Sequence, residues 1–379
     1  MKLPPLKRDG RRVKNLPKNS EPLDLSRDLG DGRGFIAGDN TALDRPIDRA
    51  SWAQEVVSSW GTYLNQEMEK TQVGKNKVVL WWLGGASFAL KTAKIFLLID
   101  NYYGGSMYTK LDTCGVCHCT GAESLNWIRI NPMIADPWEF RNVAAHLSTH
   151  QHVDHCDIYT VKALLPNTKA VFVGPGTCQP KLKAWGVPKG RMKIVRPGAR
   201  LKFGDVSVDV IESYDPAALN TGRIGEQPET MDDTCVMYLF KTPGGNILHA
   251  GDIIYNNKFA GVGLRHKIDV ALLPTGRVWR GVTDKMSYFD CYRIAEALRC
   301  KVLVPMHYDN WTNSQGNPQD VVDLMEEYAP QIKTIVLQWG ARFEYPTDAN
   351  IGRYAYPSLE EGMRIDKSWQ YGSNRNYRL

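Results

Sequence analysis

Three histidines and one aspartate lie within six consecutive positions of the sequence, as His150, His152, Asp154 and His155. Side chains two residues apart in an extended segment point the same way, so His150 and His152 can bind one metal ion. Asp154 and His155, in the turn that follows, can then bind a second ion. In a merely polar surface loop, three of the chain's eight histidines would coincide here by chance. The motif therefore predicts two metal ions and hydrolytic chemistry.

Further ligands are expected where later strands end. Asp252 directly follows the segment His249-Ala250-Gly251, and His307 follows Val304-Pro305-Met306. Gly251 permits a close approach of the backbone, and a carboxylate can bridge two cations roughly 3.5–4 Å apart around a shared hydroxide. Taken alone, Asp252 is equally typical of a stabilised turn, and His307 of a hydrogen-bonded core imidazole. Together with the histidine motif, they favour a binuclear hydrolase.

The elements that must position these residues begin with apolar runs at residues 78–83, 87–90 and 95–100, which are typical of buried strands. A strand over 142–148 leads into the histidine motif, and a helix over 158–165 follows it. Upstream, apolar residues at helical spacing from Ser51, a candidate N-cap, to Met68 predict one amphipathic helix.

A second sheet is expected after residue 170. Its strands are predicted at 170–173, 193–195, 206–211, 236–240, 247–249, 269–273, 301–305 and 334–338, with helices at 288–298 and 318–328. Two groups of strands with helices between and outside them predict an α/β fold, a four-layer αββα sandwich. The candidate site would lie along one edge of the sheets.

Composition and charge narrow the class of protein. Of 379 residues, 43% are hydrophobic and 23% charged, as in ordinary globular proteins. Residues 1–50 contain five prolines and five glycines, which favours an irregular N-terminal extension before a single domain over 51–379. Within residues 1–18, seven Lys and Arg stand against one Asp and account for the whole formal charge of +6. The remainder is close to neutral, so nucleic acid is an unlikely partner.

The sequence contains neither a long apolar run nor a charged start followed by an apolar segment. It therefore predicts no membrane span and no secretion signal, and the expected location is the cytoplasm. Eight cysteines in so long a chain are too few for a disulfide framework and are expected to be reduced thiols. Cys114, Cys117 and Cys119 include a C-x-x-C spacing that can bind zinc. No second C-x-x-C follows, so free thiols are favoured.

Several segments resemble one known family. His150, His152, Asp154 and His155 form the H-x-H-x-D-H signature of the metallo-β-lactamase superfamily. More specific matches point to the bacterial L-ascorbate-6-phosphate lactonases. They are Trp60-Gly61-Thr62-Tyr63-Leu64-Asn65, Trp81-Trp82-Leu83-Gly84, Met231-Asp232-Asp233, Phe240-Lys241-Thr242-Pro243-Gly244-Gly245, His249-Ala250-Gly251-Asp252 and Arg280-Gly281-Val282-Thr283-Asp284-Lys285-Met286. The resemblance extends from residue 51 to the C-terminus.

The resemblance implies a set of ligands. His150 and His152 would bind the first ion, Asp154, His155 and His307 the second, and Asp252 would bridge them. Many members of the superfamily have another histidine after the strand that ends here near Ile211, whereas this chain has Glu212-Ser213-Tyr214-Asp215. Asp215 is the expected substitute. An oxygen donor in place of nitrogen shifts the preference from zinc toward manganese or magnesium, of which manganese is favoured, with zinc as the alternative.

The resemblance also implies an activity, the opening of the lactone of L-ascorbate 6-phosphate to 3-keto-L-gulonate 6-phosphate. Asp154 and Asp252 would be the catalytic carboxylates, with Asp154 orienting the nucleophile or moving its proton. Arg280 and Lys285 are candidates for binding the substrate phosphate, although solvated loop charges are equally typical. Tyr108 and Trp311 are candidate substrate contacts. The lactonases of this family form homo-oligomers. A phosphodiesterase or nuclease with the same ligands is the alternative function.

Overall fold

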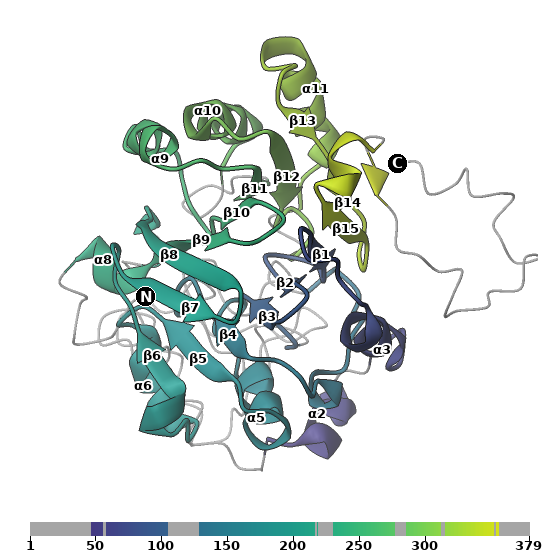
Figure 1. Ribbon diagram of the computed structural model, residues 1–379. Helices are drawn as coiled ribbons and strands as arrows, with labels where there is room; N and C mark the ends of the chain where they lie inside the picture. Colours follow the sequence, from purple (N-terminus) through teal and green to yellow (C-terminus); the bar gives the residue numbers. More distant parts are fainter. Residues whose placement is uncertain are drawn as a thin grey trace, which may run out of the picture.

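Two seven-stranded sheets form the centre of the computed structural model, with helices on the outer face of each (Figure 1). The structure describes residues 47–55, 58–104, 129–216, 218, 230–276, 286–311, 315–351 and 354–355. The first sheet contains, in spatial order, β15 (Arg342–Tyr345), β1 (Val78–Trp82), β2 (Phe88–Lys91), β3 (Phe96–Ile99), β4 (Ala145–Leu147), β5 (Val171–Gly174) and β6 (Met192–Ile194). The second contains β13 (Lys333–Thr334), β12 (Val302–Met306), β11 (Val270–Pro274), β10 (Asn246–His249), β9 (Val236–Lys241), β8 (Val206–Glu212) and β7 (Arg200–Phe203). This confirms the predicted αββα sandwich.

The helices form the two outer layers. Those on the first sheet are α2 (Arg49–Glu55), α3 (Tyr63–Lys70), α5 (Ile158–Asn167) and α6 (Cys178–Ala184), and those on the second are α9 (Phe259–Arg265), α10 (Tyr288–Leu298) and α11 (Pro318–Tyr328). The short helix α8 (Met231–Thr234) precedes β9. No helix in the described ranges is long and apolar enough to cross a membrane.

Strand β1 shows why the strands are apolar on both faces. Val78, Leu80 and Trp82 point into the core between the sheets, whereas Val79 and Trp81 pack beneath the helices of the first layer. A strand that is buried on both faces needs a continuous apolar run rather than an alternating one. This run was visible in the sequence, and the element lies where it was expected.

The helix predicted from Ser51 to Met68 was wrong, because the chain forms two helices there. Gly61 has a φ of 56° and lies in the turn before α3; this left-handed conformation interrupts a helix at little cost for glycine. Ser51 lies inside α2 and does not begin it. Its backbone N–H donates to Asp48 Oδ1 at 2.8 Å, and Asp48 N–H donates to Ser51 Oγ at 3.1 Å, a reciprocal cap at the N-terminus of α2.

The assignment of strands to sheets also needed correction. The segments 170–173 and 193–195, expected in the second sheet, correspond to β5 and β6 of the first sheet, and the second sheet begins with β7. The segment 334–338 is split between β13 and β14 (Val336–Leu337), and β14 pairs with β16 (Tyr354–Ala355) in a separate two-stranded sheet. Between β14 and β16 the chain forms β15, which pairs with β1 in the first sheet. These pairings join residues far apart in the sequence, so local patterns do not reveal them.

Candidate metal centre

All seven predicted metal ligands lie at one edge of the two sheets, where strands from both sheets end. Strand β4 leads into the segment with His150, His152, Asp154 and His155, while β8 precedes Asp215, β10 precedes Asp252 and β12 precedes His307. In the second sheet β10, β11 and β12 are parallel, and β8 is antiparallel to β9, which is antiparallel to β10. Strands β8, β10 and β12 therefore all end at the same edge.

The side chains form three groups whose ligand atoms lie within 4.8 Å of one another: His150 with His152 and Asp215, Asp154 with His155 and His307, and His150 with His155 and Asp252. The first two are the groups that the sequence proposed for the two ions. The third places Asp252 beside a histidine of each group. Its Oδ2 lies 3.4 Å from His155 Nε2, and its Oδ1 lies 3.2 Å from His307 Nε2.

The donor set fits divalent ions. All seven side chains are buried, none more than 6% exposed, and three buried carboxylates carry more negative charge than neutral imidazoles can offset. His150 Nε2 makes no hydrogen bond among the described residues and lies 3.8 Å from Asp215 Oδ2. Ligand atoms about 2.0–2.2 Å from one ion lie at most about 4.4 Å apart, so this separation suits two donors that share a cation.

Asp100, which the sequence analysis missed, holds the second group in place. Its carboxylate accepts hydrogen bonds from Thr149 N at 2.7 Å, from Thr149 Oγ1 at 2.6 Å and from His155 Nδ1 at 2.8 Å. With Nδ1 occupied in this way, His155 presents Nε2 to the candidate ligands. The available signal was the position of Asp100 at the end of the apolar run 95–100.

The backbone around the centre is strained at two places. Among described residues other than glycine, positive φ occurs at Asp100 (48°), His307 (66°) and Arg299 (55°), and the first two belong to this site. Such conformations cluster at functional sites, where the surroundings enforce them. Gly251 also has positive φ, and a Cβ there would lie 2.4 Å from Thr149 Oγ1. Glycine is therefore required for the close approach that the sequence analysis expected.

The histidine segment is anchored on its other side by residues that the sequence analysis did not identify. Lys181, a buried lysine in α6, donates from Nζ to the carbonyl oxygen of Gln151 at 2.5 Å, and Gln151 Nε2 donates to the carbonyl of Ala218 at 3.0 Å. Ala218 N–H in turn donates to Asp215 Oδ1 at 3.1 Å. The segment between His150 and His152 is thus connected to Asp215, the third member of the first group.

Burial and neighbouring charges separate the histidines into two kinds. Burial lowers the pKa of His150 well below its ordinary value and that of His152 to about 3, so both are neutral and able to bind a cation. Burial also acts to lower the pKa of His155, but the carboxylates of Asp154, Asp252 and Asp100 outweigh it and raise that pKa well above its ordinary value. In the metal-free protein these carboxylates favour the doubly protonated, positively charged form of His155.

Metal binding is expected to release about one proton at pH 7, because a ligating imidazole must give up the proton that the carboxylates hold on His155. Below the raised pKa of His155, metal affinity should increase with pH by roughly tenfold per unit for each released proton. Calorimetric titration of the metal-free protein with Mn²⁺ in buffers of different ionisation enthalpy measures the proton number. A value of zero at pH 7 would contradict this assignment.

Other predicted site residues lie elsewhere. Trp311, expected as a substrate contact, is 1% exposed and donates from Nε1 to Asp154 Oδ2 at 3.2 Å, so its contact is with a candidate ligand. Residues proposed for phosphate, substrate or zinc binding lie outside the described part of the chain: Arg280, Lys285, Tyr108, Cys114, Cys117 and Cys119. The remaining five cysteines, Cys156, Cys178, Cys235, Cys291 and Cys300, are buried free thiols.

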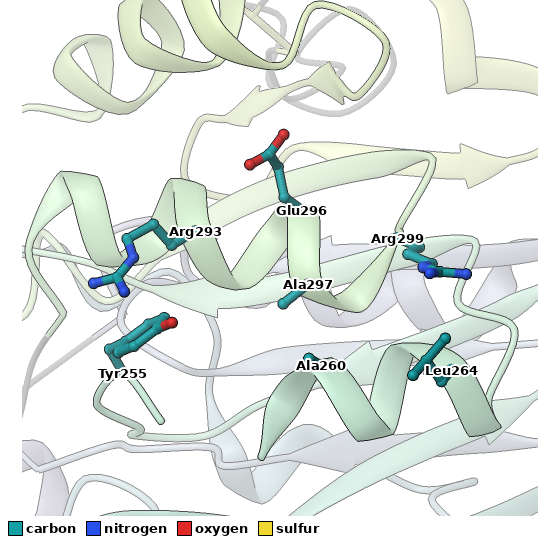
Figure 2. Close-up of a pocket in the computed structure, with 7 residues that line it drawn as sticks. All are labelled: Tyr255, Ala260, Leu264, Arg293, Glu296, Ala297 and Arg299. Carbon is teal, nitrogen blue, oxygen red and sulfur yellow. The ribbon is translucent and has the colours of Figure 1, made fainter. Parts of the chain in front are cut away.

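An open groove of about 460 Å³ lies between α9 and α10 (Figure 2), lined by Tyr255, Ala260, Leu264, Arg293, Glu296, Ala297 and Arg299. The guanidinium of Arg293 lies 3.6 Å from the centre of the Tyr255 ring. The groove belongs to the outer helical layer, and none of its lining residues is a candidate metal ligand. We therefore assign it no part in the metal centre.

Comparison with known proteins agrees with this geometry. Residues 79–307 match the family described as the β-lactamase superfamily domain. The chain is 36% identical over 332 residues to the probable L-ascorbate-6-phosphate lactonase UlaG of Escherichia coli O127:H6, an alignment that covers 83% of this chain and 94% of the relative. The protein of the same name from Salmonella choleraesuis is 36% identical over 329 residues, covering 82% and 93%.

Solved structures show the same fold. Isothiocyanate hydrolase from Delia radicum gut bacteria is 16% identical with a TM-score of 0.55, covering 70% of this chain and 98% of the other. The metallo hydrolase Igni18 from the archaeon Ignicoccus hospitalis is 18% identical with a TM-score of 0.51, covering 71% and 98%. At these identities the likeness concerns the fold alone. Together, the fold, the matched domain and the full-length relatives show that the chain belongs to the metallo-β-lactamase superfamily, in the family of the bacterial L-ascorbate-6-phosphate lactonases.

Proposed function

We propose that this protein is a metal-dependent lactonase that opens L-ascorbate 6-phosphate to 3-keto-L-gulonate 6-phosphate. The observation that carries the proposal is the position of Asp252, which shares one set of candidate ligand atoms with His150 of the first group and His155 of the second. Paired divalent ions in one site are used for hydrolysis by phosphatases, nucleases and aminopeptidases. Identity of 36% with the named lactonases over 83% of this chain favours the lactone as substrate.

The reaction is a hydrolysis. Two divalent ions bound by these groups would supply Lewis acidity at the lactone carbonyl and a hydroxide at neutral pH. The water oxygen forms a bond to the carbonyl carbon, the bond from that carbon to the ring oxygen breaks, and the ring oxygen takes a proton. In our proposal Asp252 keeps the two groups together, and Asp154 orients the attacking water or transfers its proton. An Asp154→Asn variant that retained its metal and its full turnover would eliminate that role.

The same proposal includes two divalent ions, with manganese favoured over zinc. The first group offers two imidazoles and the Asp215 carboxylate. An added oxygen donor makes a site harder, and hard sites suit Mn²⁺ better than sites of nitrogen alone. Protein purified without added ions that contained stoichiometric zinc, and that manganese did not activate, would contradict this preference.

Replacement of Asp215 by histidine is expected to shift the preference toward zinc. The change gives the first group a third nitrogen, and we expect the ratio of Zn²⁺ to Mn²⁺ affinity to rise by about tenfold or more. Asp215→Asn is the matched control, because it removes the charge but keeps an oxygen donor. Competition titrations of the three proteins with both metals measure the ratio. An unchanged ratio in Asp215→His would show that Asp215 does not bind the metal.

The substrate is tested by comparing rates with manganese present. We expect turnover of L-ascorbate 6-phosphate and negligible turnover of a bis-aryl phosphodiester. The reverse result would favour a phosphodiesterase or nuclease on the same ligands. Unphosphorylated L-ascorbate tests the phosphate separately, since we propose that Arg280 and Lys285 bind it. Equal KM values for L-ascorbate 6-phosphate and L-ascorbate would contradict the proposed binding of the phosphate by Arg280 and Lys285.

We also propose that the protein is a cytoplasmic homo-oligomer with no affinity for nucleic acid. Leu264, Phe289 and Tyr328, on the three helices that cover the second sheet, are 66%, 59% and 51% exposed, which supports a contact between copies. Light scattering on purified protein measures the assembly, and a monomer at micromolar concentration would contradict it. RNA binding that disappears when residues 1–18 are deleted would contradict the proposed lack of affinity for nucleic acid.

A further inference from the structure

Asp154 is held by two hydrogen bonds from residues that follow the last candidate ligand. Asn310 Nδ2 donates to Asp154 Oδ2 at 3.0 Å, and Trp311 Nε1 donates to the same oxygen at 3.2 Å. Both donors come from the segment after β12, three and four residues beyond His307. Both are neutral, so they can orient the carboxylate without neutralising the charge that a cation requires.

The orientation of the Asn310 amide is fixed by its neighbours. Asn310 Oδ1 accepts a hydrogen bond from Asn131 Nδ2 at 3.2 Å, and the Asn310 carbonyl accepts one from Ile130 N at 3.0 Å. An amide whose oxygen is occupied in this way presents its nitrogen to Asp154. Gly85 packs against the same side chain: its φ is 57°, and a Cβ there would lie 3.2 Å from Asn310 Oδ1.

Asn131 connects this arrangement to a second buried carboxylate. Its Nδ2 also lies 3.3 Å from Asp309 Oδ2, and Asp309 accepts hydrogen bonds from Trp339 Nε1 at 2.6 Å and from Gly85 N at 3.0 Å. The backbone of residues 309–311 therefore cannot rotate independently of its surroundings. Asn310 is held at both its side chain and its backbone.

Trp311 is fixed as firmly. Its ring packs against Tyr102 with a centroid distance of 5.5 Å, and its backbone forms an isolated antiparallel bridge with Arg129. Arg129 in turn donates from Nη1 to the carbonyl of Tyr102 at 2.8 Å. The indole N–H is thus directed at Asp154 by contacts on its ring and on its backbone.

We infer that Asn310 and Trp311 are positioning residues that fix the Asp154 carboxylate at the metal centre, where Oδ2 lies 3.3 Å from His307 Nε2 and Oδ1 lies 3.7 Å from His155 Nε2. The two N–H donors set the rotation of the carboxylate, so that each of its oxygens lies near one histidine of the second group. The pair therefore sets the affinity of the second group, which contains Asp154, His155 and His307. Among the described residues, the side-chain N–H groups of this pair donate to Asp154, a member of the second group. The expected effect on kcat rests on the proposed function, whereas the expected effect on Mn²⁺ affinity does not.

The test uses the full chain with Trp311→Phe, which removes the N–H donor and keeps an aromatic ring, and Asn310→Ala, which removes the amide. Each has a matched control. Trp185 is equally buried, and its Nε1 makes no hydrogen bond within the described ranges. Trp185→Phe therefore removes the same atoms without removing a hydrogen bond, and it keeps an aromatic ring beside Lys181, whose Nζ lies 5.7 Å from the Trp185 ring centre. Asn65 is a buried amide that bonds the backbone of Asp136 with both its nitrogen and its oxygen, so Asn65→Ala removes a comparable pair of bonds.

Mn²⁺ titration of the metal-free proteins is the primary measurement, with His152→Ala and His307→Ala used to assign each phase to one group. We expect the second group to lose about 10- to 100-fold in affinity in Trp311→Phe and in Asn310→Ala, while the first group stays unchanged. With L-ascorbate 6-phosphate at a fixed Mn²⁺ concentration, kcat should fall and KM should stay constant. Neither control should show the selective loss.

Parental affinity at both groups in the two variants would overturn the inference, as would an equal loss in the controls or an equal loss at both groups. The two proposals fail separately. If the parent protein binds two ions but hydrolyses no lactone, the proposed function is wrong, and the Mn²⁺ titration still decides the role of Asn310 and Trp311.

Discussion

The Asp252→Asn variant is expected to lose about 10³-fold in kcat on L-ascorbate 6-phosphate. Asp252 is 2% exposed and has candidate ligand atoms of both groups within 4.8 Å, from His150 of the first group and from His155 of the second. An amide offers one neutral oxygen in place of two anionic ones and cannot bridge two cations. Losing the carboxylate that we propose both ions share should remove about 4 kcal/mol of transition-state stabilisation, which corresponds to about 10³-fold in rate. Steady-state kinetics with saturating Mn²⁺ measure kcat, and metal analysis of the same sample measures the number of bound ions.

Asp269→Asn is the control for this experiment. Asp269 is 4% exposed, precedes β11 and bonds Lys301 at 2.8 Å and Asn246 N at 2.9 Å. Its replacement also removes a largely buried charge from the same sheet, but it is not a candidate ligand. We expect it to lower stability and leave kcat unchanged. An Asp252→Asn enzyme that kept two ions and at least a tenth of parental kcat would rule out the bridging role.

The Asp100→Ala variant should show the largest loss of stability, about 3–5 kcal/mol in the free energy of unfolding. The substitution leaves three donors without their acceptor, at Thr149 N, Thr149 Oγ1 and His155 Nδ1, and buried donors without partners cost the most when no water can reach them. It also places alanine at a φ of 48°, a conformation that Asp and Asn tolerate better. Urea unfolding of the metal-free proteins measures the difference.

The control for Asp100 is Asp205→Ala, because Asp205 accepts a side-chain hydrogen bond from Thr92 Oγ1 at 2.6 Å and lies away from the metal centre. We expect Asp205→Ala to lower the free energy of unfolding by about 1 kcal/mol. The loss in free energy of unfolding for Asp100→Asn should lie between the losses for Asp100→Ala and Asp205→Ala, because asparagine keeps one acceptor oxygen and tolerates the positive φ. If Asp100→Ala were no more destabilising than the control, Asp100 would not support His155 in the way described.

Local patterns in the chain predicted much of this protein. Helices α10 and α11 have the same bounds in the structure as in the sequence analysis, because amphipathic spacing and caps at Ser287 and Asn317 act within a few residues. The αββα class followed from the number and grouping of apolar runs. The candidate ligands could be found because each follows a recognisable strand and has a side chain that metals prefer.

The helix from Ser51 to Met68 shows where such patterns fail. Trp52, Leu64 and Met68 are buried at helical spacing, yet Gly61 divides them between two helices. Burial against the same sheet preserves the apolar spacing even when the helix is interrupted. Strand β7 was missed for a related reason: its four residues, Arg200–Phe203, lie at an exposed edge of the sheet, and only Phe203 among them is buried.

Sequence alone therefore established which residues could bind metal, roughly where the strands that carry them end, and which family they resemble, since these depend on side-chain type and on neighbours within a few positions. Tertiary structure decided which side chains meet. Asp100 reaches His155 across 55 positions and Asn310 reaches Asp154 across 156. An acid or an amide at the end of a strand has the same local sequence whether it faces water or a buried ligand. The packing of the two sheets determines whether such a side chain faces water or a buried ligand.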